Sequence, residues 1–306
     1  MLKFLAARFL STIPTVFIIM TMIFFVIRAV PGGPFDTEKK IPDALKQNIE
    51  RKYHLDESLP RQYLRWLGDI TFRFDLGPSF HYRGWSVNDL IAQSLPVSLL
   101  VGTLALLLAL VFGLVFGSVS ALRQNGFWDY LLMTFSVFGI SLPLFLIAPL
   151  LILLFARLLH LLPVGGWGGP LNLIIPAVTL ALPYTAYVAR LTKAGLLDQL
   201  RRDYVVTARA KGLPETTILT RHVLRGSLIP VVSFLGPAYA GIVTGSMVVE
   251  QICNVPGMGR DFVQAAFNRD YTLIAGVLLV YSLLLVAANF LVDVLYAALD
   301  PRIQYR

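Results

Sequence analysis

The sequence predicts an all-α membrane protein with six transmembrane helices, and three observations support this fold class. The chain has 306 residues, of which 56% are hydrophobic and only 14% are charged, whereas soluble domains carry about 25% charged residues. Six apolar stretches are long enough to cross a bilayer. A long polar segment separates the first stretch from the second, and a polar, basic loop lies between the fourth and the fifth.

The net charge of +8 is best explained by loops that face the cytoplasm and the lipid head groups, because the chain is too apolar for a nucleic-acid-binding domain. We therefore expect membrane lipids as neighbours and no nucleic-acid partner. Cys253 is the only cysteine, which excludes an internal disulfide and a metal site built from several cysteines.

The first predicted helix belongs to an N-terminal unit of residues 1–30. Phe9 to Ile27 are 19 residues without a charge, which is long enough to span a bilayer. A cleaved signal peptide is the alternative. We favour a retained helix, because the apolar run is longer than the hydrophobic region of a signal peptide and no clear small-x-small cleavage site follows it.

Residues 31–93 form a long segment that is too charged to span. Ala29 to Pro34 (AVPGGP) should end the first helix, and Asp43 to His54 has helical spacing. We expect this segment to fold outside the membrane as an extracytoplasmic unit. Its simplest interpretation is a solvated cap that binds no ligand.

Residues 94–306 are predicted to form a five-helix core. The loop from Arg190 to Gly226 holds eight Lys and Arg residues, whereas residues 160–170 hold none and residues 250–270 hold two. The positive-inside rule therefore places residues 190–226 in the cytoplasm. Six crossings then place both termini in the cytoplasm too. The apolar stretches of the core are Ser94–Leu122, Tyr130–Ala156, Leu171–Ala189, Ser227–Val249 and Tyr271–Val292.

The interiors of the six stretches contain no Asp, Glu, Lys, Arg or His. A charge at the centre of a transmembrane helix costs about 2.5–3.5 kcal/mol on insertion scales, so a charge that persists there usually couples transport to ions. Its absence argues against a carrier driven by protons or sodium. The G-x-x-x-G spacing of Gly113/Gly117 and Gly241/Gly245 predicts close helix packing, either within the subunit or between subunits.

Prolines interrupt two of the stretches, at positions 143, 149, 176 and 183. An intramembrane proline frees a backbone carbonyl that a neighbour or a water-filled pathway must satisfy. In the segment GISLPLF (Gly139–Phe145), Ser141 and Pro143 are therefore candidates for the edge of a pathway. A kink buried between helices is the alternative.

The loop at about residues 199–226 is the most informative stretch. Tyr204 to Lys211 is compatible with a helix, Gly212 can take the left-handed conformation that closes it, and Pro214 suits the start of another. We expect a stiff helix-corner-helix that docks something soluble, although an ordinary basic loop that only sets topology is the alternative. From Tyr204 to Pro230 the basic residues are Arg209, Lys211, Arg221, His222 and Arg225, and the one acid is Glu215.

This stretch resembles the cytoplasmic EAA loop of ABC-importer permeases, in which E-A-A and three residues precede a glycine, and nine more lead to I-x-L-P. Ala208 and Gly212 match the second alanine and the glycine, and Leu224 matches the leucine. Val206 stands in place of the glutamate. The form TARAKGLP is the one seen in the dipeptide and oligopeptide branch of the family.

Further stretches extend the resemblance over nearly the whole chain. FDLGPSF (Phe74–Phe80) is similar to the family's G-D-L-G-x-S. VVEQICNVPGMG (Val248–Gly259) is similar to V-E-x-x-F-x-x-P-G-x-G, and there we expect Glu250 to cap the fifth span at its outer face. The tail from Val292 to Tyr305 and the chain length are most similar to the B-type permease subunit of oligopeptide importers.

The resemblance implies a multi-pass protein of a bacterial inner membrane that forms the pathway for oligopeptides or dipeptides. It also implies an extracytoplasmic peptide-binding protein, a second homologous permease as heterodimer partner, and two ABC ATPase subunits that use ATP and Mg²⁺. This chain itself is expected to bind no cofactor or metal.

Two sets of residues follow from the resemblance and the spacing together. The residues expected to contact an ATPase are Thr207, Ala208, Arg209, Ala210, Lys211, Gly212, Leu213 and Pro214. The residues expected along the substrate pathway are Ser141, Pro143, Thr244, Ser246 and Glu250. For the loop after Glu250, a rigid connection without substrate contact is the alternative.

Two other functional classes fit the sequence less well. A secondary transporter or channel that works alone would leave the basic corner without a purpose. An intramembrane enzyme would need a catalytic grouping, and the sequence contains neither H-E-x-x-H nor G-x-S-x-G. The phosphate-binding motif G-x-x-x-x-G-K-[ST] is also missing. We therefore expect a translocation subunit that is not an enzyme and relies on ATP hydrolysis by its partners.

Overall fold

The computed structural model describes residues 2–30 and 54–299. Within these ranges the chain is helical and contains no strand, only an isolated bridge between Pro78 and Ser86. The helix predicted at 43–54 lies outside these ranges except for its last residue, and the tail predicted at 292–305 is described only as far as residue 299.

The described helices follow one another with short connections. They are α1 (Leu2–Ala29), α3 (Leu59–Gly68), α4 (Val87–Leu122), α5 (Phe127–Ser141), α6 (Leu144–Leu151), α7 (Pro170–Leu200), α8 (Asp203–Ala210), α9 (Glu215–Thr217), α10 (Leu224–Ser227), α11 (Ile229–Ile252), α12 (Met258–Asn268) and α13 (Tyr271–Leu299). The π-helical segments η1 (Asp69–Arg73), η2 (Ile152–Leu158) and η3 (Ile218–Val223) continue α3, α6 and α9.

Five of the described helices are long and apolar enough to cross a membrane by themselves. The corresponding segments are Leu10–Ala29, Val87–Leu122, Pro170–Leu200, Ile229–Ile252 and Tyr271–Val294. A sixth crossing comes from α5 together with α6 and η2, if this bent pair is counted as one span. The prediction of an all-helical membrane protein is confirmed, with five or six crossings in the part of the chain described.

The apolar stretch predicted at 130–156 is not one continuous helix. It breaks between α5 and α6, where the helix direction bends by 111°. Pro143 causes the break, because a proline disfavours the helical conformation of the preceding residue. Leu142 is accordingly extended, with φ −89° and ψ 130°, and Pro143 becomes the N-cap residue of α6.

Helix α7 continues beyond the end predicted at Ala189, into a segment that contains charges. One of these charges, on Lys193, meets Asp129 of α5, with Nζ and Oδ1 2.5 Å apart. The buried Asp129 carboxylate also accepts hydrogen bonds from the Ser120 hydroxyl and from the backbone N–H of Asn125. The ion pair therefore lets a charged helical turn pack against α4 and α5.

Both G-x-x-x-G pairs pack within the subunit: Gly113, Gly117 and Gly241 face α7, and Gly245 faces Leu144 of α6. A Cβ atom on Gly117 would lie 2.4 Å from the carbonyl oxygen of Ala189, and one on Gly113 would lie 2.6 Å from a side chain of the same helix. A Cβ on Gly241 would lie 2.4 Å from the Tyr184 hydroxyl oxygen. The backbone contact at Gly117 requires glycine, whereas the Tyr184 side chain at Gly241 could move aside. Dispersion contacts therefore hold α4 against α7 where lipid offers no hydrophobic driving force.

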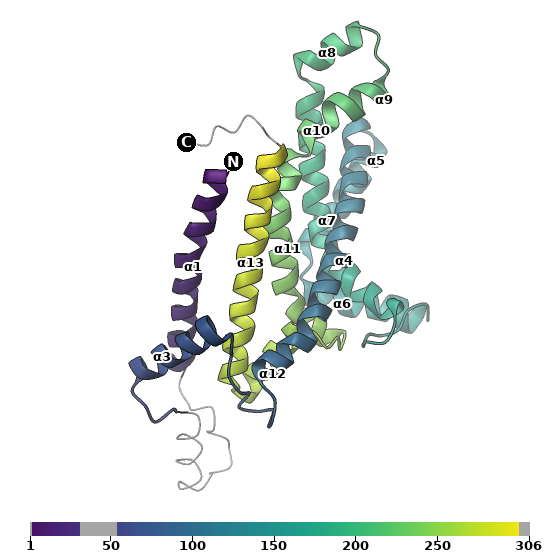
Figure 1. Cartoon of the computed structure of the whole chain (residues 1–306). Coiled ribbons are helices and arrows are strands. Elements are labelled where there is room, and N and C mark those ends of the chain that lie inside the picture. Colours follow the sequence, from purple (N-terminus) through teal and green to yellow (C-terminus); the bar gives the residue numbers. More distant parts are fainter. Residues whose placement is uncertain (1, 31–53, 300–306) are drawn as a thin grey trace.

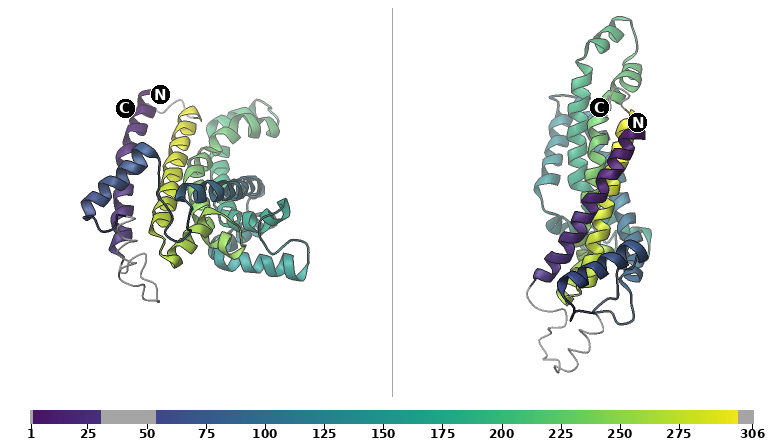
Figure 2. Two further views of the ribbon diagram at one scale, coloured as in Figure 1. Left: turned by 60° about the horizontal axis from the view of Figure 1, so that its bottom comes forward. Right: turned by 60° about the vertical axis from the view of Figure 1, so that its left-hand side comes forward.

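The long helices form a layered bundle in which α1 packs on α13, α13 on α11, α11 on α7, and α7 on α4 and α5. Helices α8, α9 and α10 lie at one end of the bundle, and α3 and α12 lie at the other (Figure 1). The first turn of α1 and the last turn of α13 lie toward the end that carries α8 to α10, as Figure 2 also shows. This arrangement is the one expected if the bent pair of α5 and α6 counts as a sixth crossing.

Candidate functional site

The predicted helix-corner-helix is present at residues 203–227, which we call the corner. Gly212 follows α8 with φ +76°, in the left-handed region that favours glycine. Its N–H donates to the carbonyl of Arg209 at 2.9 Å, and the N–H of Leu213 donates to Ala208 at 3.3 Å. Pro214, with φ −65°, is the N-cap residue of α9. The backbone itself therefore sets the turn between the two helices.

An ion pair bridges the two arms of the corner. The guanidinium of Arg209 donates to both carboxylate oxygens of Glu215, with Nε to Oε1 at 2.6 Å and Nη2 to Oε2 at 3.3 Å. This hydrogen bond raises the pKa of Arg209 and lowers the pKa of Glu215. Both side chains are about half exposed, so the pair orients α9 relative to α8 more than it stabilises the fold.

The inner face of the corner is apolar and rests on two membrane-spanning helices. Its buried side chains contact Leu196 of α7 and Ala121 of α4, which are also buried. The corner is thus attached to the bundle by packing as well as by the chain. The buried apolar residues of the corner are Val205, Ala208, Ile218 and Val223.

Backbone contacts make this attachment tight. A Cβ atom on Gly195 of α7 would lie 2.3 Å from the carbonyl oxygen of Ser227 in α10. The Tyr204 hydroxyl donates to the Gln199 side-chain oxygen at 2.7 Å, which joins α8 to α7. Helix α7 therefore contacts the corner at both of its ends, at α8 and at α10.

Seven of the eight residues expected to contact an ATPase are exposed on the corner. They are Thr207, Arg209, Ala210, Lys211, Gly212, Leu213 and Pro214. Ala208 is buried and helps to seat the corner instead. Tyr204 and Val206 are also exposed on the corner, by 41% and 59%, but they were not among the eight residues expected to contact an ATPase. The sequence did single out Val206, because this apolar residue occupies the position of the family's glutamate.

Glu250 was expected to cap the fifth span at its outer face. The structure places it in the last turn of α11, but its side chain is fully buried. Its carboxylate accepts hydrogen bonds from the hydroxyls of Ser98 at 2.7 Å and Ser246 at 2.8 Å. It also accepts from the N–H groups of Gly259 at 2.9 Å and Arg260 at 3.2 Å. These N–H groups open α12, whose positive end therefore faces the carboxylate. Glu250 anchors α12 in this conformation.

Asp270 forms a second buried anchor at the same end of the molecule. It is fully buried and accepts from the N–H groups of Leu273 and Phe80, each at 3.2 Å. It also accepts from the hydroxyls of Ser79 and Thr272. This carboxylate ties the loop before α4 to the start of α13.

Three of the residues predicted along the pathway, Ser141, Pro143 and Thr244, lie away from the Glu250 anchor. Ser141 and Pro143 are exposed at the break between α5 and α6. Leu144, the first residue of α6, lies 4.0 Å from the position of a Cβ on Gly245. The break therefore faces α11 next to Thr244, which is half-buried. The structure brings Ser246 together with Glu250, and the α5–α6 break together with the Thr244 turn, but it does not join the two groups.

These features define a class of protein: a helical membrane subunit with an exposed, rigidly seated corner at one end. Two family models match the chain. The model for the binding-protein-dependent transport system inner membrane component matches residues 113–305, and the model for the N-terminal part of such components matches residues 1–101. The chain belongs to this family. It is therefore a multi-pass inner-membrane protein and a translocation component that is not an enzyme.

Comparison with individual proteins agrees with this family. The chain is 45% identical to the oligopeptide transport system permease protein OppB of Haemophilus influenzae, over 100% of both chains, and 46% identical to OppB of Escherichia coli K12 over the same share. It is 42% identical to the dipeptide transport system permease protein DppB of Bacillus subtilis, over 99% of this chain and 98% of that one.

A chain of the methionine ABC transporter MetNI, in an inward-facing crystal form, has the same fold. The TM-score is 0.60 at 17% identity, over 70% of this chain and 97% of the other. A chain of an amino acid ABC transporter solved with histidines gives a TM-score of 0.55, with 69% of this chain and 94% of the other covered. At this level of identity the likeness shows the fold alone.

Proposed function

We propose that the chain is a permease subunit of an ATP-driven bacterial importer and forms part of the pathway for oligopeptides and dipeptides. The observation that carries this proposal is 45% identity over the full length of an oligopeptide permease. The match includes the N-terminal 101 residues, whereas the methionine transporter chain corresponds to 70% of this chain. Identity over the full length of oligopeptide and dipeptide permeases thus favours a peptide permease.

The corner and both termini face the cytoplasm in this proposal, and residues 31–93 lie outside. The excess of Lys and Arg in residues 190–226 supports this orientation. The described ends of α1 and α13 also lie toward the corner (Figure 1). A peptide-binding protein would then deliver substrate at the end that carries α3 and α12, opposite the corner.

The corner is the EAA-type coupling loop, and its exposed residues 207 and 209–214 seat in a cleft of an ATPase. Two ATPase subunits bind and hydrolyse ATP with Mg²⁺, while this chain binds no cofactor. When the ATPases close, they push on the corner. Because α7 and α10 touch through their backbones at Gly195 and Ser227, the push tilts α7 and α11 together.

The pathway opens beside α11, and a second, homologous permease completes it as a heterodimer. The break between α5 and α6 leaves Ser141 and Pro143 exposed, next to the turn of α11 that carries Thr244. Ser246 and Glu250 act one turn further on, where they hold α12 in this conformation. A tilt of α11 would therefore change the contact with α6 and the position of α12 together.

Peptide uptake by the complete complex in proteoliposomes tests the proposal. Gly212→Pro fixes φ near −65° where the corner needs +76°, so we expect ATP-dependent uptake to be lost while the subunit still reaches the membrane. Gly212→Asn is the matched control, because asparagine tolerates the left-handed region, and it should retain uptake. Normal uptake by Gly212→Pro would contradict coupling through the corner.

A separate experiment addresses the alternative of a transporter or channel that works alone. Purification in mild detergent followed by mass spectrometry should recover ATPase subunits and a second permease. Accumulation of peptide by the isolated chain, without nucleotide, would overturn the proposed function.

A further inference from the structure

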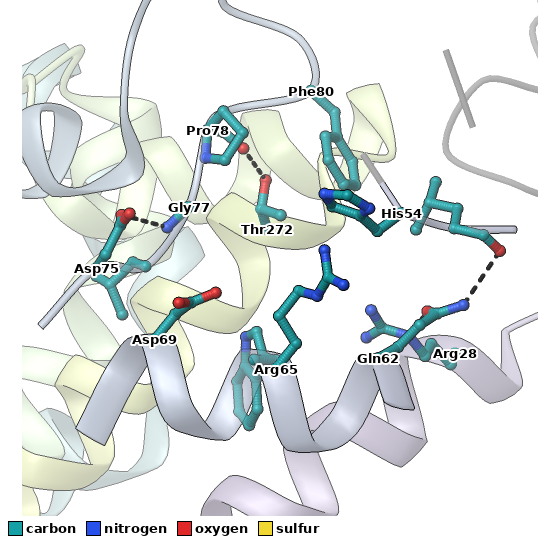
Figure 3. A pocket seen from close by; sticks show the side chains of 13 residues that line it. Arg28, His54, Gln62, Arg65, Asp69, Asp75, Gly77, Pro78, Phe80 and Thr272 are labelled. Carbon is teal, nitrogen blue, oxygen red and sulfur yellow. Dashed lines mark hydrogen bonds between the residues drawn. The ribbon is translucent and has the colours of Figure 1, made fainter. Parts of the chain in front are cut away.

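The ion pairs of the described residues differ in how far apart their partners lie in the sequence. Figure 3 shows Asp69 at the pocket between the end of α1 and helix α3, and this residue pairs with Arg73, four positions further on, at 3.0 Å. Such a pair involves a single segment of the chain. The pair of Asp129 and Lys193 instead joins two helices of the bundle, α5 and α7.

The Asp129 carboxylate holds three helices together at one end of the bundle. It accepts hydrogen bonds from the Ser120 hydroxyl of α4 and from the N–H of Asn125, in the turn before α5, at 3.0 Å. Nζ of Lys193 in α7 lies 2.5 Å away, and the two charged side chains are only 6% and 22% exposed. Loss of either charge would leave the other buried without compensation. The three contacts therefore define one position of α5 relative to α4 and α7.

The helix turns that bind Asp129 also support the corner. Ala121 directly follows Ser120 on α4, and Leu196 lies about one helical turn after Lys193 on α7. Both Ala121 and Leu196 are buried together with the apolar side chains of the corner. A displacement of the corner would therefore act first on the two turns that hold the carboxylate.

Helix α5 leads from this carboxylate to the break before α6. Asp129 lies in its first turn, and Ser141 is its last residue. Near the far end, a Cβ atom on Gly139 would lie 3.0 Å from the carbonyl oxygen of Leu182 in α7, so α5 lies against α7 near both of its ends. Packed helices can slide past each other by small shear motions, whereas a buried ion pair fixes their register.

We propose that Asp129 is a positioning residue for transport, which keeps α5 in register with the helix turns that support the corner. A displacement of the corner then moves α4, α5 and α7 together and reaches the α5–α6 break, where Ser141 lies. Without the pair to Lys193, α5 slides relative to α7 and the break no longer follows the corner. The inference depends on the proposed function, because an ATPase has to displace the corner.

Two measurements on the complete complex test the proposal. The first is the amount of peptide transported per ATP hydrolysed in proteoliposomes. The second is the rate at which a small methanethiosulfonate reagent labels Ser141→Cys, without nucleotide and with ATP plus vanadate, read on this chain by mass spectrometry. Cys253, the only native cysteine, is 1% exposed, so the introduced thiol is the one that reacts.

The variants of the pair should lose coupling while the complex still assembles. Asp129→Asn should lower the ratio of transport to ATP hydrolysis about tenfold, a typical size for coupling between sites, and should abolish the nucleotide-dependent change in labelling at residue 141. Lys193→Met should do the same, and the double variant should be no worse than either single variant, because both act through one pair. Lys193→Arg keeps the charge and should restore most of the coupling.

Asp293→Asn is the matched control. It removes the ion pair with Arg8, at 3.2 Å, which joins α13 to α1 and lies outside the turns that support the corner. Both measurements should stay at the wild-type level. The thermal midpoint of each purified complex is recorded as well, because a purely structural role of Asp129 would lower this midpoint and leave the nucleotide-dependent labelling intact.

Nucleotide-dependent labelling that persists in an assembled Asp129→Asn complex would overturn the inference, and so would losses that add up in the double variant. A complex that carries only Ser141→Cys, takes up peptide with ATP and shows no change in labelling would also overturn it, while the proposed function would stand. Failure of the proposed function looks different: the wild type would show no ATP-dependent uptake, and the inference would fall with it.

Discussion

The two ends of the molecule use charge in opposite ways. At the corner, Arg209 and Glu215 form an exposed pair, and apolar side chains provide the packing. At the α12 end, Glu250 and Asp270 are fully buried and accept hydrogen bonds from backbone N–H groups of helix starts. Removing a buried carboxylate leaves its donors without partners, whereas an exposed pair exchanges its contacts for water. Charge therefore maintains structure at one end and presents a surface at the other.

The largest expected effect is that of Glu250→Ala. It leaves the N–H groups of Gly259 and Arg260 and the hydroxyl of Ser98 without their acceptor, so we expect a loss of about 3 kcal/mol in the free energy of unfolding. The measurement is thermal unfolding of the purified complex in detergent. Glu215→Gln, at the corner, is the control and should leave the thermal midpoint unchanged. Equal stability of the two variants would remove the contrast between the ends.

A smaller loss is expected for Gly117→Ala, at the contact of α4 with α7. The new Cβ would approach the carbonyl oxygen of Ala189 to 2.4 Å, so the helices must separate, at a cost of about 1–3 kcal/mol. Gly68→Ala in α3 is the matched control, because nothing lies within 4 Å of its Cβ position. The same thermal measurement should show no loss of stability for Gly68→Ala. A stable Gly117→Ala would mean that the two helices can separate freely.

Gly212→Ala should have a still smaller effect on stability but a visible one on transport. The left-handed conformation costs an ordinary residue about 1–2 kcal/mol, and no atom lies within 4 Å to add a clash. The ratio of peptide transported to ATP hydrolysed should fall, with Gly212→Asn between the wild type and Gly212→Ala. If the two variants transport equally well, the φ of +76° is not what positions the corner.

The smallest effect on stability is expected for Arg209→Glu, which should nevertheless uncouple transport. The double variant Arg209→Glu/Glu215→Arg restores an ion pair across the corner. Recovery of transport in the double variant would show that the bridge between the two arms matters, whereas failure to recover would assign the role to the Arg209 charge at the ATPase surface.

The pH dependence of the corner follows from the same pair. Arg209 lowers the pKa of Glu215, so the pair is present above the ordinary carboxyl range and is lost only as the pH falls through the lowered value. Coupling should therefore stay constant across neutral pH. A decline in the ratio of transport to ATP hydrolysis between pH 8 and pH 6, roughly, would point to another group.

Local features of the fold could be predicted from the sequence because their causes are local. Apolar runs predict spans, Pro143 predicts an interruption, and the left-handed turn follows from Gly212 with Pro214 two positions later. Contacts between distant residues left no local pattern. Ser98 and Glu250 are 152 positions apart, and Asp129 and Lys193 are 64 apart.

The consequences of those distant contacts were missed for the same reason. Helix α7 was predicted to end at its first charge, since the partner that neutralises Lys193 lies on another helix. Helix α12 was not predicted, and its residues were described only as a loop after Glu250, although Met258, Phe262 and Ala265 have the spacing of one helical face. The positions predicted to contact an ATPase or line the pathway remain predictions.

The glycine contact between α7 and α10 determines where the bundle can flex. With Gly195 against the Ser227 carbonyl, no side chain separates the two backbones, so neither helix can yield there by a change of rotamer. Any bending has to occur further into the membrane. Helix α7 and helix α11, which follows α10 directly, contain interior prolines, Pro176 and Pro183 in α7 and Pro237 in α11, where a ladder hydrogen bond is missing. A displacement of the corner would therefore change the curvature of α7 and α11 near their middle.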